Sequence, residues 1–318
     1  MYWSYSSSKT FRRCQRRWYF QTIIPNSKPN AKDRIRREAF FLAQLQSVEA
    51  WRGSIVDWVI DKQIIRPLNQ VGRFSEQRVW SYAEEIFNAQ IQFAREKHYR
   101  DEGMTKTKGD DRYAALFLLE HGYLDVPETD LERAWQDIET ALSNLLADDE
   151  IMFWLHEADQ LLPQRNLFLH DDDFAVKAVP DVILFYEDAP PLIFDWKVHT
   201  TGQRDYWLQL ACYALALTRS EPHKDFIVDP QKYSPAEVKL AEVQLLLPQT
   251  RWYELSEDDV DAVENYFYSS ATDMLLALGD EGNEILRPLE FLPTQYPDED
   301  CPTCPFQKMC GADTLWTK

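Results

Sequence analysis

One stretch of the chain, residues 180–213, constrains the fold more than any other: PDVILFYEDAPPLIFDWKVHTTGQRDYWLQLACY. It reads as two apolar strands followed by a helix. In an extended strand alternate side chains share a face, so Asp195 and Lys197 emerge together while Trp196 points the other way. A hairpin between the strands brings Asp181 alongside. The stretch therefore predicts a pocket with two carboxylates for a hard cation, and a lysine for the developing charge of a phosphodiester transition state.

The rest of the chain indicates a large α/β protein. Its 318 residues are 45% hydrophobic, enough to bury a sizeable core. The period changes from helical to strand-like near residue 158, and we expect a sheet of four or five strands flanked by helices. We expect a single domain over 1–318. Within it, a basic N-terminal helix covers 1–26, a helical region 68–150, a core that carries the pocket 151–295, and a cysteine segment 296–318.

Local signals predict where several helices begin and end. The segment KTFRRCQRRWYFQ reads as one helix that follows the serine caps Ser6 to Ser8 and ends before Pro25. A second helix covers 31–51. Gly53 and its neighbours then break the pattern and cap a further helix, on which Asp57 borders the apolar stripe. The longest apolar runs are too short to cross a membrane, so we expect a cytoplasmic protein without a membrane contact.

The charge distribution favours a polyanion at one place only. The net charge of −19 argues against nucleic acid, whose phosphates are bound mainly by Lys and Arg. Residues 1–40 nevertheless carry ten Lys and Arg against two acids, and four of the arginines are clustered at Arg12, Arg13, Arg16 and Arg17. A basic segment on an acidic body fits a protein that meets a polyanion along one face. The alternative is a solvated basic helix with no ligand.

A cysteine motif lies near the C-terminus, where Cys301, Cys304 and Cys310 form a C-x2-C-x5-C run. Three thiolates need a fourth ligand, which is either Cys14 or Cys212. Cys212 falls inside an apolar helix, whereas arginines that favour the thiolate surround Cys14, so Cys14 is the better candidate. The spacing fits zinc or an iron–sulfur cluster and does not separate them.

At this point the chain resembles the PD-(D/E)XK nuclease superfamily, and within it the RecB-like group that includes AddB-type helicase-nuclease subunits and CRISPR-associated RecB-like exonucleases. An ordered set of motifs spans nearly the whole chain. These are Ser6-Ser7-Ser8 through Cys14-Gln-Arg-Arg-Trp-Tyr-Phe, Gly53-Ser-Ile-Val-Asp57, Pro180-Asp181, Phe194-Asp195-Trp-Lys197, Gln209-Leu-x-x-Tyr213 and Cys301-x2-Cys304-x5-Cys310.

The resemblance implies a restriction-endonuclease-like core and assigns roles to these residues. Asp181, Asp195 and the backbone carbonyl of Trp196 would bind Mg²⁺ or Mn²⁺, and Lys197 would assist the attacking water. Gln209 and Tyr213, four residues apart on one helix face, would lie beside the scissile strand. The resemblance also implies that Cys14, Cys301, Cys304 and Cys310 hold a [4Fe-4S] cluster that clips the N-terminal segment to the C-terminal one. It further implies that Arg12, Arg13, Arg16 and Arg17 line a single-stranded DNA path with Trp18 and Tyr19 as stacking platforms.

One position departs from the family pattern. The family usually has a histidine four residues after the glycine, where this chain has Asp57. Aspartate is an oxygen ligand suited to Mg²⁺, so we favour a site with three carboxylates, Asp57, Asp181 and Asp195. The alternative is an ordinary carboxylate on the surface of a helix.

Two functions remain open from the sequence. The first is a metal-dependent deoxyribonuclease, a single-strand or end-processing exonuclease in DNA repair, recombination, CRISPR adaptation or mobile-element defence. A helicase or an integrase-type protein would be its partner. The second is a non-cleaving iron–sulfur subunit that binds DNA or acts as a scaffold. The presence of both Asp195 and Lys197 favours the first, because a retired site has no reason to keep the pair.

Overall fold

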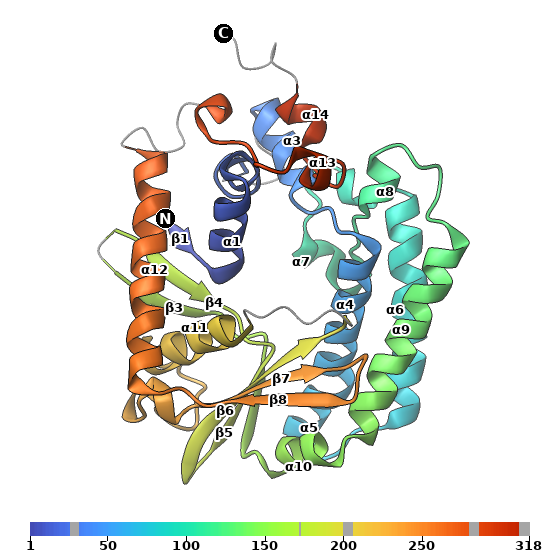
Figure 1. Ribbon diagram of the computed structural model, residues 1–318. Coiled ribbons are helices and arrows are strands. Elements are labelled where there is room, and N and C mark those ends of the chain that lie inside the picture. Colours follow the sequence, from blue (N-terminus) through green and yellow to red (C-terminus); the bar gives the residue numbers. More distant parts are fainter. Residues whose placement is uncertain (26–31, 172, 200–205, 280–285, 312–318) are drawn as a thin grey trace. The chain divides into compact units, whose positions relative to one another are not determined.

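The structure is a computed structural model that describes residues 1–25, 32–171, 173–199, 206–279 and 286–311 (Figure 1). Contacts divide the chain into two compact units. Unit 1 comprises Met1–Trp3, Val48–Asn88 and Pro127–Phe267, and unit 2 comprises Ser4–Ser47, Ala89–Val126 and Tyr268–Lys318. Sheets and helices are both present, and this mixed α/β arrangement fits the predicted restriction-endonuclease-like fold.

A five-stranded sheet in the order β2-β5-β6-β7-β8 forms the centre of unit 1. Its strands are Gln160–Pro163, Val182–Tyr186, Ala189–Lys197, Lys239–Gln244 and Gln249–Tyr253. Neighbouring strands are antiparallel except for β6 and β7, which run parallel. β5 and most of β6 are buried, as expected of the near-continuous apolar runs in the sequence.

A smaller sheet in the order β1-β4-β3 is built from Tyr2–Trp3, Ala175–Ala178 and Leu167–His170. The N-terminal strand β1 pairs in parallel with β4, and β3 pairs with β4 in the antiparallel sense. Trp3 is buried against Phe267, with ring centroids 6.0 Å apart. This contact ties the first residues of the chain into unit 1.

Helices cover the large sheet of unit 1. They are α4 (Val48–Val59), the π-helical η2 (Ile60–Ile65), α5 (Arg66–Val71), α9 (Glu128–Ala147), α10 (Asp149–Glu157) and α11 (Tyr206–Arg219). α6 (Glu76–Arg95) and α12 (Glu257–Leu278) contribute residues to both units. α11 contacts β6 and β7, and α4 packs against α9. Local signals set the ends: the Asp148 side chain accepts a hydrogen bond from Ile151 N–H at 3.0 Å, and Gly279 follows α12 with φ 62°.

Unit 2 begins with α1 (Tyr5–Arg13), α2 (Gln15–Trp18), the π-helical η1 (Tyr19–Ile23) and α3 (Arg34–Leu42). It continues with η3 (His98–Arg100), α7 (Lys106–Gly109), η4 (Asp110–Arg112) and α8 (Phe117–Glu120), and ends with η7 (Pro288–Glu290), α13 (Pro297–Asp300) and α14 (Gln307–Cys310). Aromatic rings join the two ends of the chain within this unit: Tyr19 stacks on Phe291 at 4.1 Å and Phe20 on Phe306 at 5.5 Å.

The predicted bounds of the first three helices were wrong. The first helix is interrupted at Cys14, whose extended backbone (φ −158°, ψ 103°) separates α1 from α2, and its cap is Ser4. The helix expected over 31–51 ends at Leu42, and α4 starts at Val48. α4 then passes through Gly53 without a break, because Ile55 and Val56 on the next turn are fully buried and tertiary packing outweighs the cost of one glycine.

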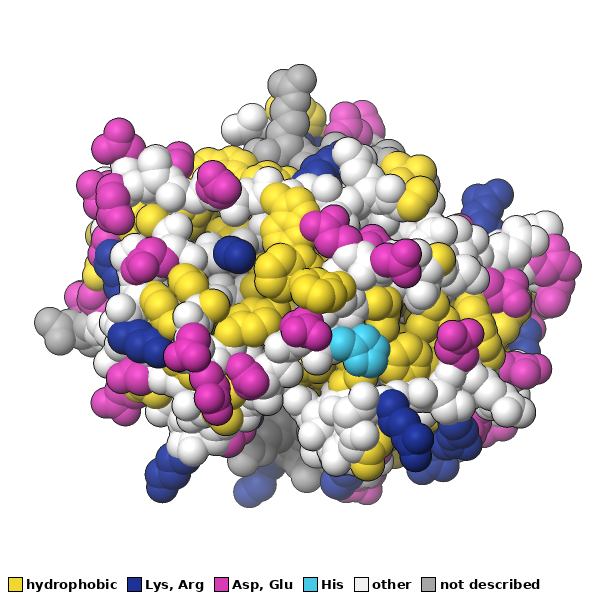
Figure 2. Space-filling model, turned by 90° about the horizontal axis from the view of Figure 1, so that it is seen from below, with side chains coloured by type: hydrophobic (Ala, Val, Ile, Leu, Met, Phe, Trp, Pro, Cys, Tyr) yellow, Lys and Arg dark blue, Asp and Glu magenta, His cyan; other side chains and the backbone are white. Residues whose placement is uncertain are grey.

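The face seen in Figure 2 is a mixture of apolar and acidic side chains. Hydrophobic side chains gather in its middle, with acidic side chains among and around them. Exposed aromatic residues of unit 1 include Phe153 and Trp252. In the described part of the chain, no helix is both long enough and apolar enough to span a membrane.

Candidate active site

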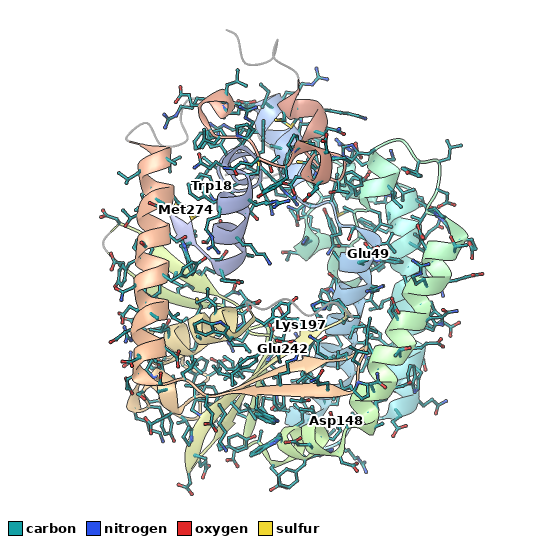
Figure 3. All side chains as sticks on the ribbon, viewed as in Figure 1. Trp18, Glu49, Asp148, Lys197, Glu242 and Met274 are labelled. Atoms are coloured by element: carbon teal, nitrogen blue, oxygen red, sulfur yellow. The ribbon has the colours of Figure 1, made fainter. Side chains whose placement is uncertain are left out.

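The candidate site of unit 1 is a row of polar side chains that crosses the large sheet at one level. Register pairs Asp195 on β6 with Glu242 on β7, and Glu242 with Arg251 on β8. On the other side of β6, Asp181 directly precedes β5, one step beyond the Val182–Phe194 pair, and is therefore opposite Asp195. Figure 3 shows Lys197 and Glu242 close together on the adjacent strands. The predicted alternation thus places Asp195, Lys197 and Asp181 at one end of the sheet.

Asp195 and Lys197 form a buried ion pair through Oδ2 and Nζ. The Asp195 side chain is 2% exposed and that of Lys197 is 13% exposed. Burial by itself would lower the pKa of Lys197, but the negative charges of Asp195 and Asp181 outweigh it and the pKa is raised. Lys197 is therefore a permanent cation beside the carboxylates. Among the described residues, Asp195 Oδ2 has no hydrogen bond in addition to this ion pair.

Three aspartates share this site electrostatically. Burial, followed by the negative charge of Asp195, raises the pKa of Asp57 to about 7. Burial, followed by the charges of Asp195 and Asp57, raises the pKa of Asp181 well above its ordinary value. Burial also raises the pKa of Asp195, although Lys197 opposes the shift. Burial and nearby negative charge thus favour the protonated forms of these carboxyl groups, and a nearby divalent cation would favour their ionised forms.

Asp181 is held in place by two donors. The backbone N–H of Trp196 donates to Asp181 Oδ2 at 2.8 Å, and Gln164 Nε2 donates to Asp181 Oδ1 at 3.0 Å. Gln164 follows β2 and adopts the left-handed backbone region with φ 47°, and its N–H also donates to the carbonyl of Asp181 at 3.0 Å. Gln164 was not predicted as a site residue, because nothing in the local sequence marks a glutamine in a turn as a partner of Asp181.

Helix α11 brings Gln209 and Tyr213 to the same carboxylates. Gln209 Nε2 donates to the Tyr213 hydroxyl, so the two side chains share a helix face as their spacing predicts. Tyr213 is buried, and burial followed by the charges of Asp195 and Asp181 raises its pKa. Tyr206 at the start of α11 lies 4.8 Å from Lys197 Nζ, measured to its ring centroid, and bonds His199 Nε2 at 2.7 Å.

The buried carboxylate of this row, Glu242, has a hydrogen-bond network of its own that was not predicted from the sequence. Glu242 is fully buried, and it accepts hydrogen bonds from Gln244 Nε2, from Arg251 Nη1 at 3.1 Å and from the Tyr253 hydroxyl at 2.9 Å. Its charge contributes to the raised pKa of Asp195. The alternating strand KLAEVQ offers Glu242 as a buried polar residue, but its partners come from β8 and only the register brings them together.

A match to a known protein family accompanies this arrangement of residues. A family model described as the PD-(D/E)XK nuclease superfamily matches residues 2–311. The chain belongs to the PD-(D/E)XK nuclease superfamily. Its members are nucleases that typically use Mg²⁺ or Mn²⁺. A nuclease binds nucleic acid, and DNA is therefore the expected partner of the site.

Curated proteins and solved structures give no assignment beyond the superfamily. A comparison with curated proteins gives no match. A solved structure titled "Crystal structure of SSO0001" covers 82% of this chain and 98% of its own at 11% identity, with a TM-score of 0.29. That score is too low for a comparison of the two folds.

The carboxylate set suits the divalent cation of a PD-(D/E)XK nuclease. The donors are carboxylate oxygens, which hard cations prefer, and among the described residues the buried Asp195 Oδ2 has the Lys197 ion pair and no hydrogen bond beyond it. In the described residues, no group of three or more His, Cys, Asp or Glu side chains is already arranged around a metal position. Lys197 contacts Asp195 Oδ2, and the Trp196 N–H donates to Asp181 Oδ2.

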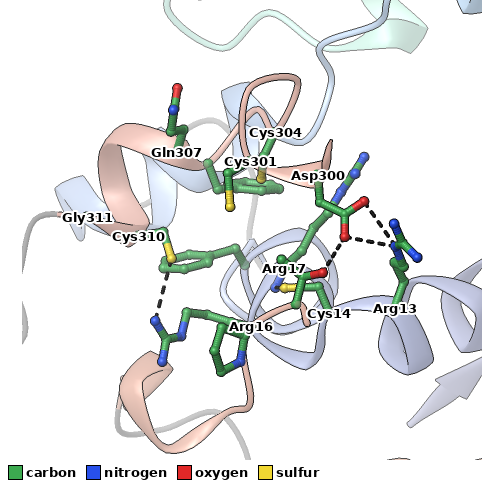
Figure 4. Close-up of a pocket in the computed structure, with 14 residues that line it drawn as sticks. Arg13, Cys14, Arg16, Arg17, Asp300, Cys301, Cys304, Gln307, Cys310 and Gly311 are labelled. Atoms are coloured by element: carbon green, nitrogen blue, oxygen red, sulfur yellow. Dashed lines mark hydrogen bonds and ion pairs between the residues drawn. The ribbon is translucent and has the colours of Figure 1, made fainter. Parts of the chain in front are cut away.

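The four predicted cluster cysteines lie together in unit 2. Cys14, Cys301, Cys304 and Cys310 line one cavity of about 370 Å³ (Figure 4). None of the four is in a disulfide, and burial raises the pKa of Cys301, with nearby Cys310 and Cys14 adding to the shift. Cys212 is buried in α11 of unit 1, where burial raises its pKa to about 12. Four thiols around one cavity have the donor chemistry of a zinc or iron–sulfur site.

The interruption between α1 and α2 at Cys14 sets the position of its thiol. Cys14 Sγ accepts a hydrogen bond from the Arg17 N–H at 3.3 Å and so caps α2, a role that an uninterrupted helix would not allow. Arg16 Nη1 approaches Cys310 Sγ at 3.7 Å. Among the described residues, Arg17 Nε is buried without a hydrogen-bond partner. Two arginines thus direct positive charge at the thiols.

The predicted DNA-contacting residues of the N-terminal helices differ in what they can do. Arg13 pairs with Asp300 at 2.8 Å and with Glu299 at 2.9 Å, and it lies over the Tyr296 ring. Arg16 and Arg17 line the cysteine cavity, and Arg12 is exposed on α1. Trp18 and Tyr19 are fully buried, so the idea that they stack on bases is wrong. Their rings pack on Phe291, which completes the core of unit 2.

Proposed function

We propose that the protein is a Mg²⁺- or Mn²⁺-dependent deoxyribonuclease of the RecB-like group. The observation that supports this most is the buried Asp195–Lys197 ion pair with Asp181 opposite it and Asp57 within electrostatic reach. Replacing a whole buried ion pair with apolar residues of similar volume is often neutral or stabilising, so a scaffold protein would gain little stability from keeping both charges. A nuclease needs both charges.

In this proposal Asp57, Asp181, Asp195 and the Trp196 carbonyl hold the cation. The charges near β6 and β7 support a single divalent ion: four carboxylates, from Asp57, Asp181, Asp195 and Glu242, face two cations, Lys197 and Arg251. When bound, the cation lowers the pKa of a water molecule and offsets charge on the phosphate. Its binding also lowers the pKa values of the carboxylates, because opposite charge favours the ionised form.

The chain's own groups orient the reaction. Lys197 stays protonated and places positive charge where the phosphate gains negative charge. The Trp196 N–H and the Gln164 amide fix both oxygens of Asp181. Gln209 and Tyr213 position the strand from α11, and the ring of Tyr206 restrains Lys197.

We further propose that Cys14, Cys301, Cys304 and Cys310 hold a [4Fe-4S] cluster, with zinc as the alternative occupant. The shared cavity and the adjacent guanidinium groups support an anionic thiolate-bound group there. The cluster would clip the segment 1–26 to the segment 296–318 within one nuclease domain, of which 68–150 is the helical region and 151–295 the core. Broad absorption near 400 nm in anaerobically purified protein would distinguish it from zinc.

The substrate is proposed to be DNA that is single-stranded or has single-stranded ends. The basic cluster of Arg12, Arg13, Arg16 and Arg17 would then meet the backbone, as its local charge suggests. An end-processing exonuclease of this kind would act in the cytoplasm, in repair, recombination, CRISPR adaptation or mobile-element defence. Unwinding would fall to a helicase partner, and capture of new DNA to an integrase-type partner.

Cleavage of labelled single- and double-stranded DNA with Mg²⁺ or Mn²⁺ tests the proposal. Wild type should cleave, Lys197→Ala should lose at least a hundredfold in rate, and Lys224→Ala, at an exposed lysine of unit 1, should behave as wild type. Substrates with 5′ or 3′ overhangs then report the end that is attacked. DNA binding without cleavage under any metal would reject the nuclease and leave the non-cleaving iron–sulfur subunit.

A further inference from the structure

Arg251 is a partly exposed cation in the same row as the catalytic residues. It lies on β8, opposite Glu242, which in turn lies opposite Asp195. Side chains paired across neighbouring strands point to the same face of the sheet. Arg251 is therefore on the face that carries Asp195 and Lys197, two strands away from Asp195, which corresponds to about 10 Å between backbones.

The guanidinium group is oriented by a buried partner while part of it stays open to solvent. Arg251 Nη1 donates to Glu242 Oε1 at 3.1 Å, and the Arg251 side chain is 35% exposed while Glu242 is 0% exposed. Glu242 is itself fixed by the Tyr253 hydroxyl at 2.9 Å and by Gln244. A rigid carboxylate thus orients the planar fork of an arginine, the geometry that suits bidentate binding of a phosphate.

Lys197 and Arg251 both act electrostatically on Tyr206. Their positive charges oppose the rise of the Tyr206 pKa that burial causes. The Tyr206 ring lies 4.8 Å from Lys197 Nζ. The two residues are thus cations on one face of the sheet, each paired with a buried carboxylate, and the Arg251 side chain is the more exposed of the two, 35% against 13%.

We propose that Arg251, oriented by Glu242, is a phosphate-binding subsite for a nucleotide adjacent to the scissile bond of the substrate strand. Because the subsite is displaced from Asp195 by two strands, it holds a neighbouring phosphate of the strand and takes no part in the reaction itself. It binds the substrate and Glu242 is its positioning residue. This rests on the proposed function for the identity of the strand, but binding at the subsite requires no cleavage.

A purely structural role, in which Arg251 only neutralises Glu242, makes a different prediction. A phosphate contact releases counterions, so its loss lowers the slope of log K against log salt by about 0.7 for single-stranded DNA. A structural ion pair away from the substrate changes protein stability and leaves that slope unchanged. The two roles are separated by Arg251→Lys, which keeps a cation beside Glu242, and by Glu242→Gln/Arg251→Gln, which removes both charges.

The test measures the affinity of a labelled single-stranded oligonucleotide in EDTA over a range of salt. Arg251→Gln should bind about tenfold more weakly, as expected for one charge-assisted hydrogen bond, with the slope reduced by about 0.7. Glu242→Gln/Arg251→Gln, which removes the buried charge together with its partner, should show the same loss, and Arg251→Lys should keep the slope. Arg219→Gln is the matched control: Arg219 pairs with Glu264 in unit 1 and its side chain is 37% exposed.

The outcomes separate this subsite from the nuclease itself. Wild-type affinity and slope in both Arg251→Gln variants would overturn the subsite, even if wild type cleaves DNA. A reduced slope in a protein whose wild type never cleaves would support the subsite and reject the nuclease. If both hold, Arg251→Gln should raise KM about tenfold with kcat nearly unchanged, because the contact is present equally in the ground and transition states.

Discussion

Replacing Asp57 with Asn should stabilise the metal-free protein in a pH-dependent way. In the folded chain, burial and the charge of Asp195 raise the pKa of Asp57 from 3.8 to about 7. Between these values the unfolded chain releases the proton of Asp57 while the folded chain keeps it, so the wild type loses stability as pH rises through this window. That gap corresponds to about 4 kcal/mol. Asn has no proton to lose, and the variant avoids the loss.

The assay is urea unfolding followed by tryptophan fluorescence in EDTA, at pH 4.5 and pH 8. The difference in unfolding free energy between Asp57→Asn and wild type should grow by about 3 to 4 kcal/mol from the lower pH to the higher. Asp261→Asn, at an exposed carboxylate of α12, should show no such growth. Comparing each variant with wild type cancels the titration of groups that Asp57 does not influence. Removing the charge of Asp57 also lowers the pKa of Asp181, which adds to the difference in the same direction.

Mg²⁺ should narrow the stability difference between Asp57→Asn and wild type by about 1.3 to 2.3 kcal/mol. At a Mg²⁺ concentration of one hundred times its Kd, the wild type gains about 2.7 kcal/mol at pH 8. If Asp57 is a ligand, its loss weakens the affinity by at least ten- to a hundredfold, and the variant gains only about 0.4 to 1.4 kcal/mol. Parallel pH curves for wild type and Asp57→Asn, together with equal stabilisation by Mg²⁺, would refute the reasoning and return Asp57 to the surface of its helix.

Two further predictions concern residues around the two sites. Gln164→Ala removes the donor to Asp181 Oδ1 and should raise the Mg²⁺ concentration needed for half-maximal cleavage by about ten- to a hundredfold with little change in the maximal rate, and an unchanged requirement would contradict a positioning role. Cys14→Ser should abolish bound iron or zinc in metal analysis and lower the melting temperature, whereas Cys212→Ser should retain the metal, and metal retained by Cys14→Ser would remove Cys14 from the ligand set.

Much of the candidate site on the large sheet could be predicted from local pattern. Alternation along PLIFDWK put Asp195 and Lys197 on one face, and the apolar run after Asp181 identified β5. The helix that carries Gln209 and Tyr213 is also where its period places it. Local periodicity determines these positions, because each depends on residues only a few places apart in the chain.

The residues that escaped prediction depend on distant pairings. Glu242 meets Asp195 only because β7 lies parallel to β6, and Arg251 meets Glu242 only through the register of β8. Neither relationship is encoded near either residue. The burial of Trp18 has the same origin, since its ring packs on Phe291 near the other end of the chain.

Because the row crosses all five strands of the large sheet, the site forms only when every strand is in register. Gln164, Asp181, Asp195, Glu242 and Arg251 come from five successive positions across the sheet, at or next to its five strands. A slip of one residue in any strand would turn its polar group to the opposite face and put a different side chain in its place, an apolar one at Asp181, Asp195 and Glu242. A chain with one misaligned strand could therefore be compact and still have no activity, so turnover reports correct assembly of the sheet more stringently than compactness does.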